Sequence, residues 1–316
     1  MTVICSALLR TVSMVPVLMV ASIVSLEYFV FVTEYWLPKF QRSEGFFVLI
    51  RILEMILFNS VVGCMLFAYY KVVLTDPGYV TPSVLQRIQD AIQNAMEEGG
   101  KKNPPMINSC YRCNRLKPFR AHHCSFCNRC VLKMGTCGKV IYRVHYLSSR
   151  LCADHHCPWV ANCIGEGNYK YFFQFVVYAF LALSMCVRAL AEPFRAAVFS
   201  GNAPRGGANF SVMAVVGFVL GGALAISLLG FIVVHSYLLF HGSTTIECQQ
   251  YGRAFPYNLG WQKNFKDVFG ETTTDWLLPT TPTEQERYVL HPAELEHLTA
   301  DRCFGDLSDQ EDDSLL

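Results

Sequence analysis

Four long apolar segments constrain this chain more than any other feature of its sequence. They cover about residues 11–31, 46–70, 171–190 and 212–240. Each is long enough to cross a hydrocarbon core about 30 Å thick as a helix. They explain a composition of 52% hydrophobic and only 16% charged residues, which is unlike that of a soluble domain. The sequence therefore predicts an all-α membrane protein with four transmembrane helices.

A few charged residues lie within or near these segments. Arg51 and Glu54 are three positions apart in the second segment, so we expect them to pair within one helix, while Glu27 lies in or near the first. The first segment continues through Phe31 without a clear small-residue cleavage site. We therefore expect it to be a retained helix and not a signal peptide.

The distribution of basic residues predicts the orientation of the chain. Residues 71–170 contain fourteen of the 26 lysines and arginines, whereas residues 37–44 contain only Lys39 and Arg42. An excess of positive charge marks cytosolic loops, so we expect the large central loop and both termini in the cytosol. A net charge of +1 gives no indication of nucleic-acid binding.

A dense cluster of cysteines lies in the central loop. Nine cysteines fall between positions 110 and 163. Cytosolic cysteines stay reduced, and pairs two residues apart present two thiolates to one tetrahedral zinc, so the cluster indicates metal binding or catalysis. The motifs in chain order are Cys110-x2-Cys113, His123-Cys124-x2-Cys127-x2-Cys130 and Asp154-His155-His156-Cys157, with Cys163 after them.

Counting ligands separates one cysteine from the rest. Without Cys137 and Cys152, which belong to an unusual segment described below, seven cysteines remain. Two Cys3His zinc sites would use six of them and leave one. Cys157 is the best candidate, because an adjacent aspartate and two histidines can lower a thiol pKa and orient a base. The alternative remains open that all four residues of this tetrapeptide are metal ligands or a structural turn.

These motifs resemble the DHHC family of protein S-acyltransferases, the membrane palmitoyltransferases. The likeness covers about residues 10–270. Further motifs of the family stand in the expected order: Asp76-Pro77-Gly78, Trp159-x2-Asn162-Cys163-x-Gly165-x2-Asn168, Thr244-Thr245-Ile246-Glu247, and Asn258-Leu259-Gly260 with Asn264 and Val268-Phe269-Gly270. The resemblance implies four membrane helices with a cytosolic zinc-binding cysteine-rich domain between the second and third.

The resemblance also implies a role for each residue of the site. Cys157 would be the nucleophile, with His155 as its general base and Asp154 orienting the histidine. Two structural zinc ions would be held by eight residues: Cys110, Cys113, His123 and Cys130 for the first, and Cys124, Cys127, His156 and Cys163 for the second.

The implied reaction has two steps. Cys157 takes a long-chain acyl group from palmitoyl-CoA or a similar acyl-CoA, and passes it to a cytosolic cysteine of a membrane-associated protein. Thr245 and Glu247 are expected to brace the site. Basic residues that could meet the CoA phosphates are Arg115, Lys117, Arg120, Arg129 and Lys133. The expected location is the bilayer of the Golgi, endosomes or plasma membrane, and no nucleic-acid partner is expected.

One segment departs from the family pattern. Residues 135–153 (the insertion) stand between Met134 and Asp154, and deleting them restores the family's four-residue spacing after Cys130. The insertion is either an additional loop or translated intron sequence; we favour the second, because its ends are compatible with an in-frame donor and acceptor. Since it leads directly into the catalytic turn, we expect reduced or no autoacylation. The alternative function is a catalytically weak or inactive zinc-bearing membrane scaffold.

The rest of the chain completes the expected organisation. We expect a helix over residues 82–98 in the connector before the cysteines, closed by two glycines. Beyond Gly270 the chain has twelve acidic residues and two arginines, a composition typical of a disordered tail. The expected divisions are residues 1–70 (helices 1 and 2), 71–170 (cysteine-rich domain), 171–240 (helices 3 and 4), 241–270 (C-terminal motifs) and 271–316 (acidic tail).

Overall fold

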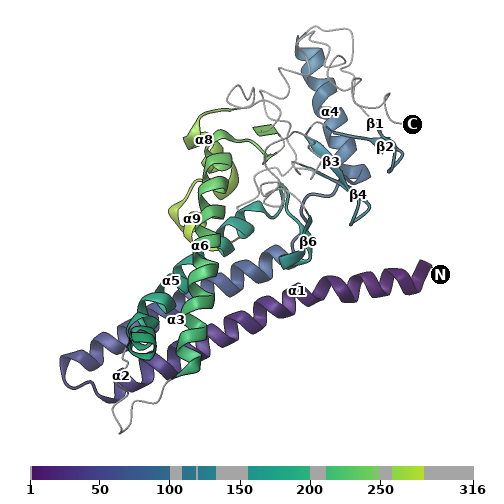
Figure 1. Ribbon diagram of the computed structural model, residues 1–316. Coiled ribbons are helices and arrows are strands. Elements are labelled where there is room, and N and C mark those ends of the chain that lie inside the picture. The colour runs from purple at the N-terminus through teal and green to yellow at the C-terminus, as the bar shows by residue number, and fades with distance from the viewer. Residues whose placement is uncertain are drawn as a thin grey trace, which may run out of the picture.

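Four helices in the computed structural model are long and apolar enough to cross a membrane. They span Met14–Gln41, Phe46–Leu74, Tyr169–Val198 and Val212–His241, so the predicted four-helix, multi-pass architecture is confirmed. Figure 1 shows them side by side at one end of the molecule, with the strands at the other. The structure describes residues 2–99, 109–118, 120–132, 156–199, 211–245, 247–248 and 258–280.

The first span is longer than the sequence predicted. α1 (Thr2–Val30) passes without a break into the π-helix η1 (Phe31–Trp36) and then α2 (Leu37–Gln41). The wider π turn places Phe31 and Tyr35 against α3 (Phe46–Leu74): Phe31 stacks on Phe58 with ring centroids 3.9 Å apart, and the Tyr35 hydroxyl donates to Glu54. Residues 32–41 therefore also belong to the first span.

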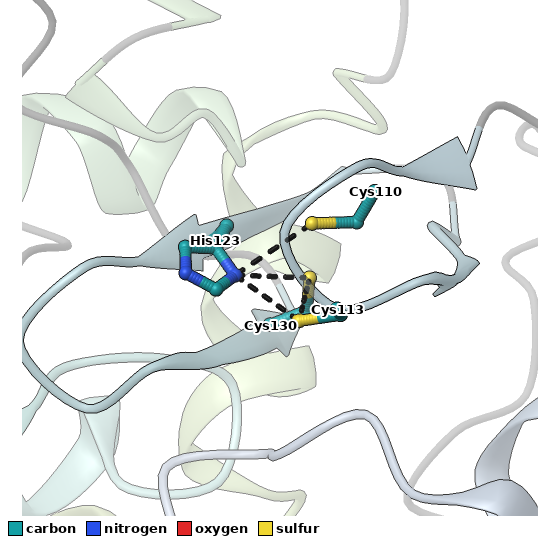
Figure 2. Close-up of side chains that lie close together, drawn as sticks. All are labelled: Cys110, Cys113, His123 and Cys130. Carbon is teal, nitrogen blue, oxygen red and sulfur yellow. Dashed lines mark hydrogen bonds between the residues drawn. The ribbon is translucent and has the colours of Figure 1, made fainter.

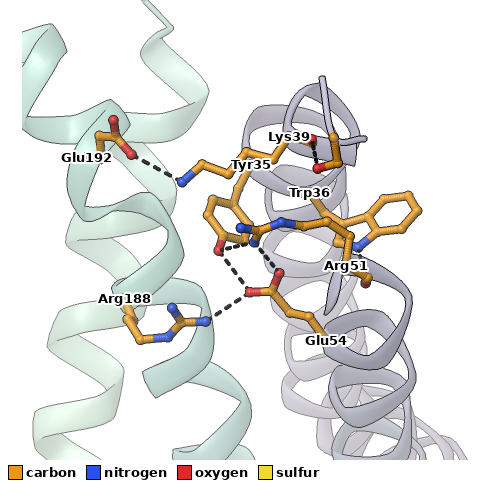
Figure 3. A network of polar contacts seen from close by, with 8 residues as sticks. Tyr35, Trp36, Lys39, Arg51, Glu54, Arg188 and Glu192 are labelled. Atoms are coloured by element: carbon orange, nitrogen blue, oxygen red, sulfur yellow. Dashed lines mark hydrogen bonds and ion pairs between the residues drawn. The ribbon is translucent and has the colours of Figure 1, made fainter. Parts of the chain in front are cut away.

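A polar network joins three helices (Figure 3) near α2, which lies at the end of the bundle away from the strands in Figure 1. Glu54 of α3 accepts hydrogen bonds from Tyr35 at 2.8 Å, Arg51 at 2.6 Å and Arg188 at 3.0 Å, the last from α5 (Tyr169–Phe199). The predicted Arg51–Glu54 pair is thus confirmed. A second ion pair, Lys39–Glu192 at 3.2 Å, joins α2 to α5.

Small residues let α6 (Val212–His241) approach α1 closely. A Cβ atom at Gly217 would lie 3.0 Å from both Val30 and Leu190, and one at Gly221 would lie 3.2 Å from the carboxylate of Glu27. Close contact through glycine is the usual way in which helices pack without a hydrophobic driving force in lipid. Glu27 is buried at this crossing.

The cysteine-rich domain consists of three short antiparallel hairpins. They are β1 (Ser109–Cys110) with β2 (Arg115–Leu116), β3 (Ala121–Cys124) with β4 (Arg129–Leu132), and β5 (His156–Cys157) with β6 (Asn162–Cys163); the 3-10 turn η3 (Pro158–Val160) lies within the third. The first two turn at Asn114 and Asn128, whose φ angles of 51° and 52° suit asparagine. Before them, α4 (Pro82–Gly99) matches the predicted helix.

The C-terminal elements fold back onto the bundle. α8 (Trp261–Phe269) follows α6, and Asn264 at its centre donates to the Phe240 carbonyl at 2.8 Å. The first ten residues of the expected disordered tail are also part of the fold, because α9 (Thr273–Leu277) packs beside the bundle (Figure 1). The remainder of that tail, residues 281–316, lies outside the described residues.

Candidate functional site

The first two hairpins bring together four potential metal ligands (Figure 2). Cys110 lies in β1, Cys113 in the turn after it, His123 in β3 and Cys130 in β4. The Nδ1 atom of His123 is 3.1 Å from the Cys113 sulfur, 3.6 Å from that of Cys110 and 4.0 Å from that of Cys130. The register of the second hairpin places two of these ligands next to each other, since His123 pairs directly with Cys130.

A second group of the same type joins residues that are far apart in the chain. Cys124 and Cys127 come from the second hairpin, and His156 and Cys163 pair with each other across the third. The Cys127 sulfur lies 3.3 Å from both the His156 Nδ1 atom and the Cys163 sulfur. The structure thus assembles the eight residues in the two sets that the resemblance implied.

Both groups fit a tetrahedral zinc ion. A zinc–sulfur bond of about 2.3 Å places two ligand atoms of a tetrahedron about 3.8 Å apart. In each group all four ligand atoms lie within 4.8 Å of one another, and the Cys113–Cys130 sulfur pair is 3.6 Å apart. Three thiols and one imidazole are the donor set of structural zinc sites.

Cys157 belongs to neither group, the only such cysteine in the described part of the cysteine-rich domain. It is 4% exposed and lies in a cluster with apolar side chains from the membrane helices. Val72 of α3 and Phe172 and Val176 of α5 are members of this cluster. The thiol therefore lies where the cysteine-rich domain meets the helix bundle.

The described surroundings of Cys157 act on its thiol in two opposing ways. Burial raises the pKa of the Cys157 thiol above its ordinary value, although the backbone N–H groups of Trp159 and Val160 favour the thiolate. A nucleophilic thiolate at this position therefore requires a neighbouring base.

The turn after Cys157 is tied to the end of α3. The amide of Asn162 donates to the carbonyls of Val72 at 3.0 Å, Val73 at 3.2 Å and Thr75 at 2.9 Å. These carbonyls lack helical partners at the C-terminus of α3, so one side chain both caps the helix and positions the turn. Asn168 extends the contact by donating to the Cys163 carbonyl at 2.8 Å.

The Asp76-Pro77-Gly78 motif lies against the glycines that follow the site. A Cβ atom at Gly165 would be 2.4 Å from the Pro77 carbonyl oxygen, and one at Gly167 would be 2.2 Å from that of Asp76. Only glycine permits this approach of two backbones. The motif also pairs with β4, since Leu132 donates to the Gly78 carbonyl at 2.9 Å.

A buried ion pair connects the cysteine-rich domain to the segment after α6. Arg120 binds both carboxylate oxygens of Glu247, at 2.5 Å and 2.7 Å, and also donates to the Gly242 carbonyl at 2.9 Å. Thr244 and Glu247 bond each other's backbone N–H groups as a capping box does. Burial opposes the charge of Glu247, but these bonds outweigh it and lower the pKa of the carboxyl.

Comparison with known proteins identifies the family. Residues 148–252 match the DHHC palmitoyltransferase family. Probable protein S-acyltransferase 14 of Arabidopsis thaliana is 33% identical over 93% of this chain and 92% of its own length. The chain belongs to the DHHC family. Palmitoyltransferase ZDHHC15 of Homo sapiens is also similar, at 28% identity over 85% of this chain and 79% of its own. The protein is thus a protein S-acyltransferase, as the sequence predicted.

Part of the DHHC motif lies outside the described residues. His156 and Cys157 are described, whereas Asp154, His155 and the insertion are not. The family match begins at residue 148, within the insertion, so five of the six cysteine ligands of the two groups lie before it. The roles of Asp154 and His155 therefore remain predictions from the resemblance.

The structure revises the basic residues expected near the CoA phosphates. Arg120 was wrongly included, because its side chain is 9% exposed and its charge is paired with Glu247. Arg115 and Arg129 are exposed, and Lys117 is partly so, which leaves them accessible to an anion. Lys133 lies outside the described residues.

Removing one partner of the Arg120–Glu247 pair should be strongly destabilising. We expect Arg120→Ala to cost about 3–5 kcal/mol, because it leaves a buried carboxylate without its cation. The double variant Arg120→Met with Glu247→Gln should recover most of this loss. Thermal unfolding of the detergent-solubilised protein measures both.

A matched control is the exposed pair Lys266–Glu271, whose side chains are 45% and 64% exposed. Lys266→Ala should cost less than about 1 kcal/mol, because solvent screens the charges. Equal destabilisation by Arg120→Ala and Lys266→Ala would show that the buried pair contributes no more to stability than an exposed pair.

Proposed function

We propose that this DHHC protein transfers a long-chain acyl group, palmitoyl in the first instance, through a thioester on Cys157. The observation that carries the proposal is the position of Cys157: outside both Cys3His groups and against apolar side chains of α3 and α5. An acyl chain gains about 0.8 kcal/mol for each methylene that it buries, so a nucleophile at the head of an apolar bundle suits a chain of about sixteen carbons.

The proposed reaction consists of two thioester exchanges. In the first, the Cys157 thiolate attacks the carbonyl carbon of acyl-CoA, and the CoA thiolate leaves. In the second, the thiolate of a substrate cysteine attacks the acyl-enzyme and Cys157 leaves. His155, oriented by Asp154, accepts the thiol proton in each step and returns it to the thiolate that leaves. The raised pKa of Cys157 supports the need for such a base.

The two Cys3His groups would each hold a zinc ion with a structural role. Such an ion fixes the backbone that bears its ligands. The second group has a direct bearing on catalysis, because its ligand His156 immediately precedes Cys157 and its ligand Cys163 pairs with His156 across the hairpin. The ligands thereby position the nucleophile without touching the acyl group.

The metal content of variants tests this assignment. We expect two zinc ions per chain in the purified protein and one in Cys113→Ser, since that site loses a thiolate. Cys157→Ser should retain both ions, as should the control Cys186→Ser, which changes a buried cysteine of α5 outside both groups. Loss of an ion from Cys157→Ser, measured by elemental analysis, would instead identify Cys157 as a ligand.

The orientation of the chain supports the choice of substrates. With the lysine- and arginine-rich loop in the cytosol, Cys157 would act on cysteines of membrane-associated proteins at the cytosolic face. Of the basic residues expected to meet the CoA phosphates, Arg115, Lys117 and Arg129 are accessible. The location that fits these partners is the Golgi, endosomal or plasma membrane.

A zinc-bearing scaffold of the same fold is the alternative, and the insertion favours it. Incubation of purified protein with an alkyne-labelled palmitoyl-CoA separates the two. Label that neutral hydroxylamine releases indicates an acyl-enzyme thioester. Zinc-replete protein that takes up no label, with or without residues 135–153, would establish the scaffold.

A further inference from the structure

Three polar residues form a stripe along the first ten residues of α5. Lys170, Gln174 and Tyr178 are spaced four apart, so they lie on one face of the helix. Lys170 and Gln174 are 5% and 3% exposed. Polar side chains at such positions in a membrane helix require partners.

Their partners are backbone carbonyls of the C-terminal strap, which we define as residues 272–280. Lys170 donates to the Thr280 carbonyl at 3.0 Å, and Tyr178 donates to that of Leu277. Gln174 donates to the carbonyls of Trp276 at 3.0 Å and Leu278 at 3.1 Å. The stripe therefore binds the main chain of a segment that lies about a hundred residues further along the sequence.

The length of the third span indicates how deep these contacts lie in a bilayer. The third span has 30 residues, or about 45 Å of helix, which exceeds the hydrocarbon core by about 15 Å. With the excess shared between the two faces, Gln174 lies near the boundary of the core and Tyr178 about 6 Å inside it. Figure 1 shows α9 farther along the bundle than α8, in agreement with this depth.

Non-helical backbone is tolerated at membrane depth only where protein satisfies its polar groups. The α5 stripe provides such partners for the residues at the end of α9 and after it. The apolar side chains of the same residues remain uncovered: Leu277 is 64% exposed and Leu278 is 45% exposed. The Trp276 indole is fixed by its hydrogen bond to the Gly270 carbonyl at 2.8 Å.

We propose that the C-terminal strap is a lipid-inserted element. Leu277 and Leu278 enter the acyl-chain region of the leaflet next to the cysteine-rich domain, while the α5 stripe binds the backbone behind them. The occupant of this apolar surface is bilayer lipid, because the length of the span places the surface at the depth of the outer hydrocarbon layer. The protein thereby gains a membrane contact besides its four spanning helices.

Photo-crosslinking of the full chain tests the proposal. p-Benzoylphenylalanine is placed at position 277, the protein is reconstituted in phosphatidylcholine nanodiscs, and adducts are identified by intact mass after irradiation. Position 271 is the matched control, since the Glu271 side chain is also 64% exposed. We expect at least about fivefold more lipid adduct at position 277 than at 271, because only the former reaches the acyl chains.

A second variant tests the role of α5. With the probe at position 277, Gln174→Leu should reduce the lipid adduct by about half or more, because two strap carbonyls lose their donor. Gln86→Leu, on the exposed side of α4, should leave it unchanged. Equal lipid adduct at positions 271 and 277, or adducts at 277 to a second protein chain, would overturn lipid insertion; an unchanged yield in Gln174→Leu would overturn the anchoring by α5.

Discussion

Cys157→Ser should abolish hydroxylamine-sensitive acyl incorporation from palmitoyl-CoA, lowering it by a factor of at least about 100. A serine hydroxyl is a far weaker nucleophile than a thiolate at neutral pH, and an ester on serine resists neutral hydroxylamine. The effect is large because no other cysteine of the described cysteine-rich domain lies outside the two Cys3His groups. The measurement is best made in the form without the insertion, where the expected signal is highest.

Two cysteines near the bundle serve as matched controls. Cys186 lies inside α5 and is buried, and Cys248 follows Glu247 and is partly exposed. Cys186→Ser and Cys248→Ser should retain the label. Label that persists in Cys157→Ser but disappears in Cys248→Ser would move the acyl-enzyme to the other residue and contradict the proposed function.

Local patterns explain what was predictable from the sequence. The four spans follow from the length and composition of single segments, and the Arg51–Glu54 pair follows from helical spacing. A Cys-x2-Cys motif brings its two thiols close together without help from distant residues. The presence of metal-binding groups could therefore also be predicted from the sequence. The sharing of ligands between hairpins, such as Cys127 with His156, came from the resemblance and not from spacing.

Contacts between distant segments were not predictable in the same way. Arg120 and Glu247 are 127 positions apart. In a loop with many basic residues, the sequence does not distinguish an arginine that pairs with a distant carboxylate from one that binds an anionic ligand. The sequence did not predict the contacts of the strap, because its residues belong to an acidic tail whose composition is typical of disorder. One signal was present in the sequence: Lys170 and Gln174 are polar residues at the start of an apolar span and needed partners.

In the sequence, the insertion stands between two strands whose ends contact the rest of the domain. β4 ends at Leu132 and β5 begins at His156, and both ends are fixed by contacts within the domain. The Leu132 carbonyl accepts from the Glu166 N–H at 3.3 Å, and His156 lies 3.3 Å from the Cys127 sulfur. Without residues 135–153, four residues would join the strands, and their five peptide links reach up to about 18 Å.

Deleting residues 135–153 should raise autoacylation about tenfold or more relative to the chain as written. The deletion removes nineteen residues that directly precede the DHHC motif in the sequence, and displacements of a fraction of an ångström matter at a catalytic site. It also removes Cys137, His145 and Cys152, which can compete for zinc. Hydroxylamine-sensitive uptake of labelled palmitoyl-CoA, normalised to zinc content, measures the effect, and equal uptake by both forms would refute it.

Two further variants separate the causes. A Gly/Ser segment of equal length in place of the insertion keeps the distance along the chain but removes the competing ligands. If this form is as active as the deletion, competition for metal explains the loss; if it stays as weak as the original chain, the added length at the catalytic turn does. Because loop-closure entropy grows slowly with length, reduced activity in the Gly/Ser form would reflect the geometry of Asp154 and His155 and not global unfolding.

Sequencing of spliced transcripts tests the origin of the segment: its presence in nearly all messages would exclude translated intron.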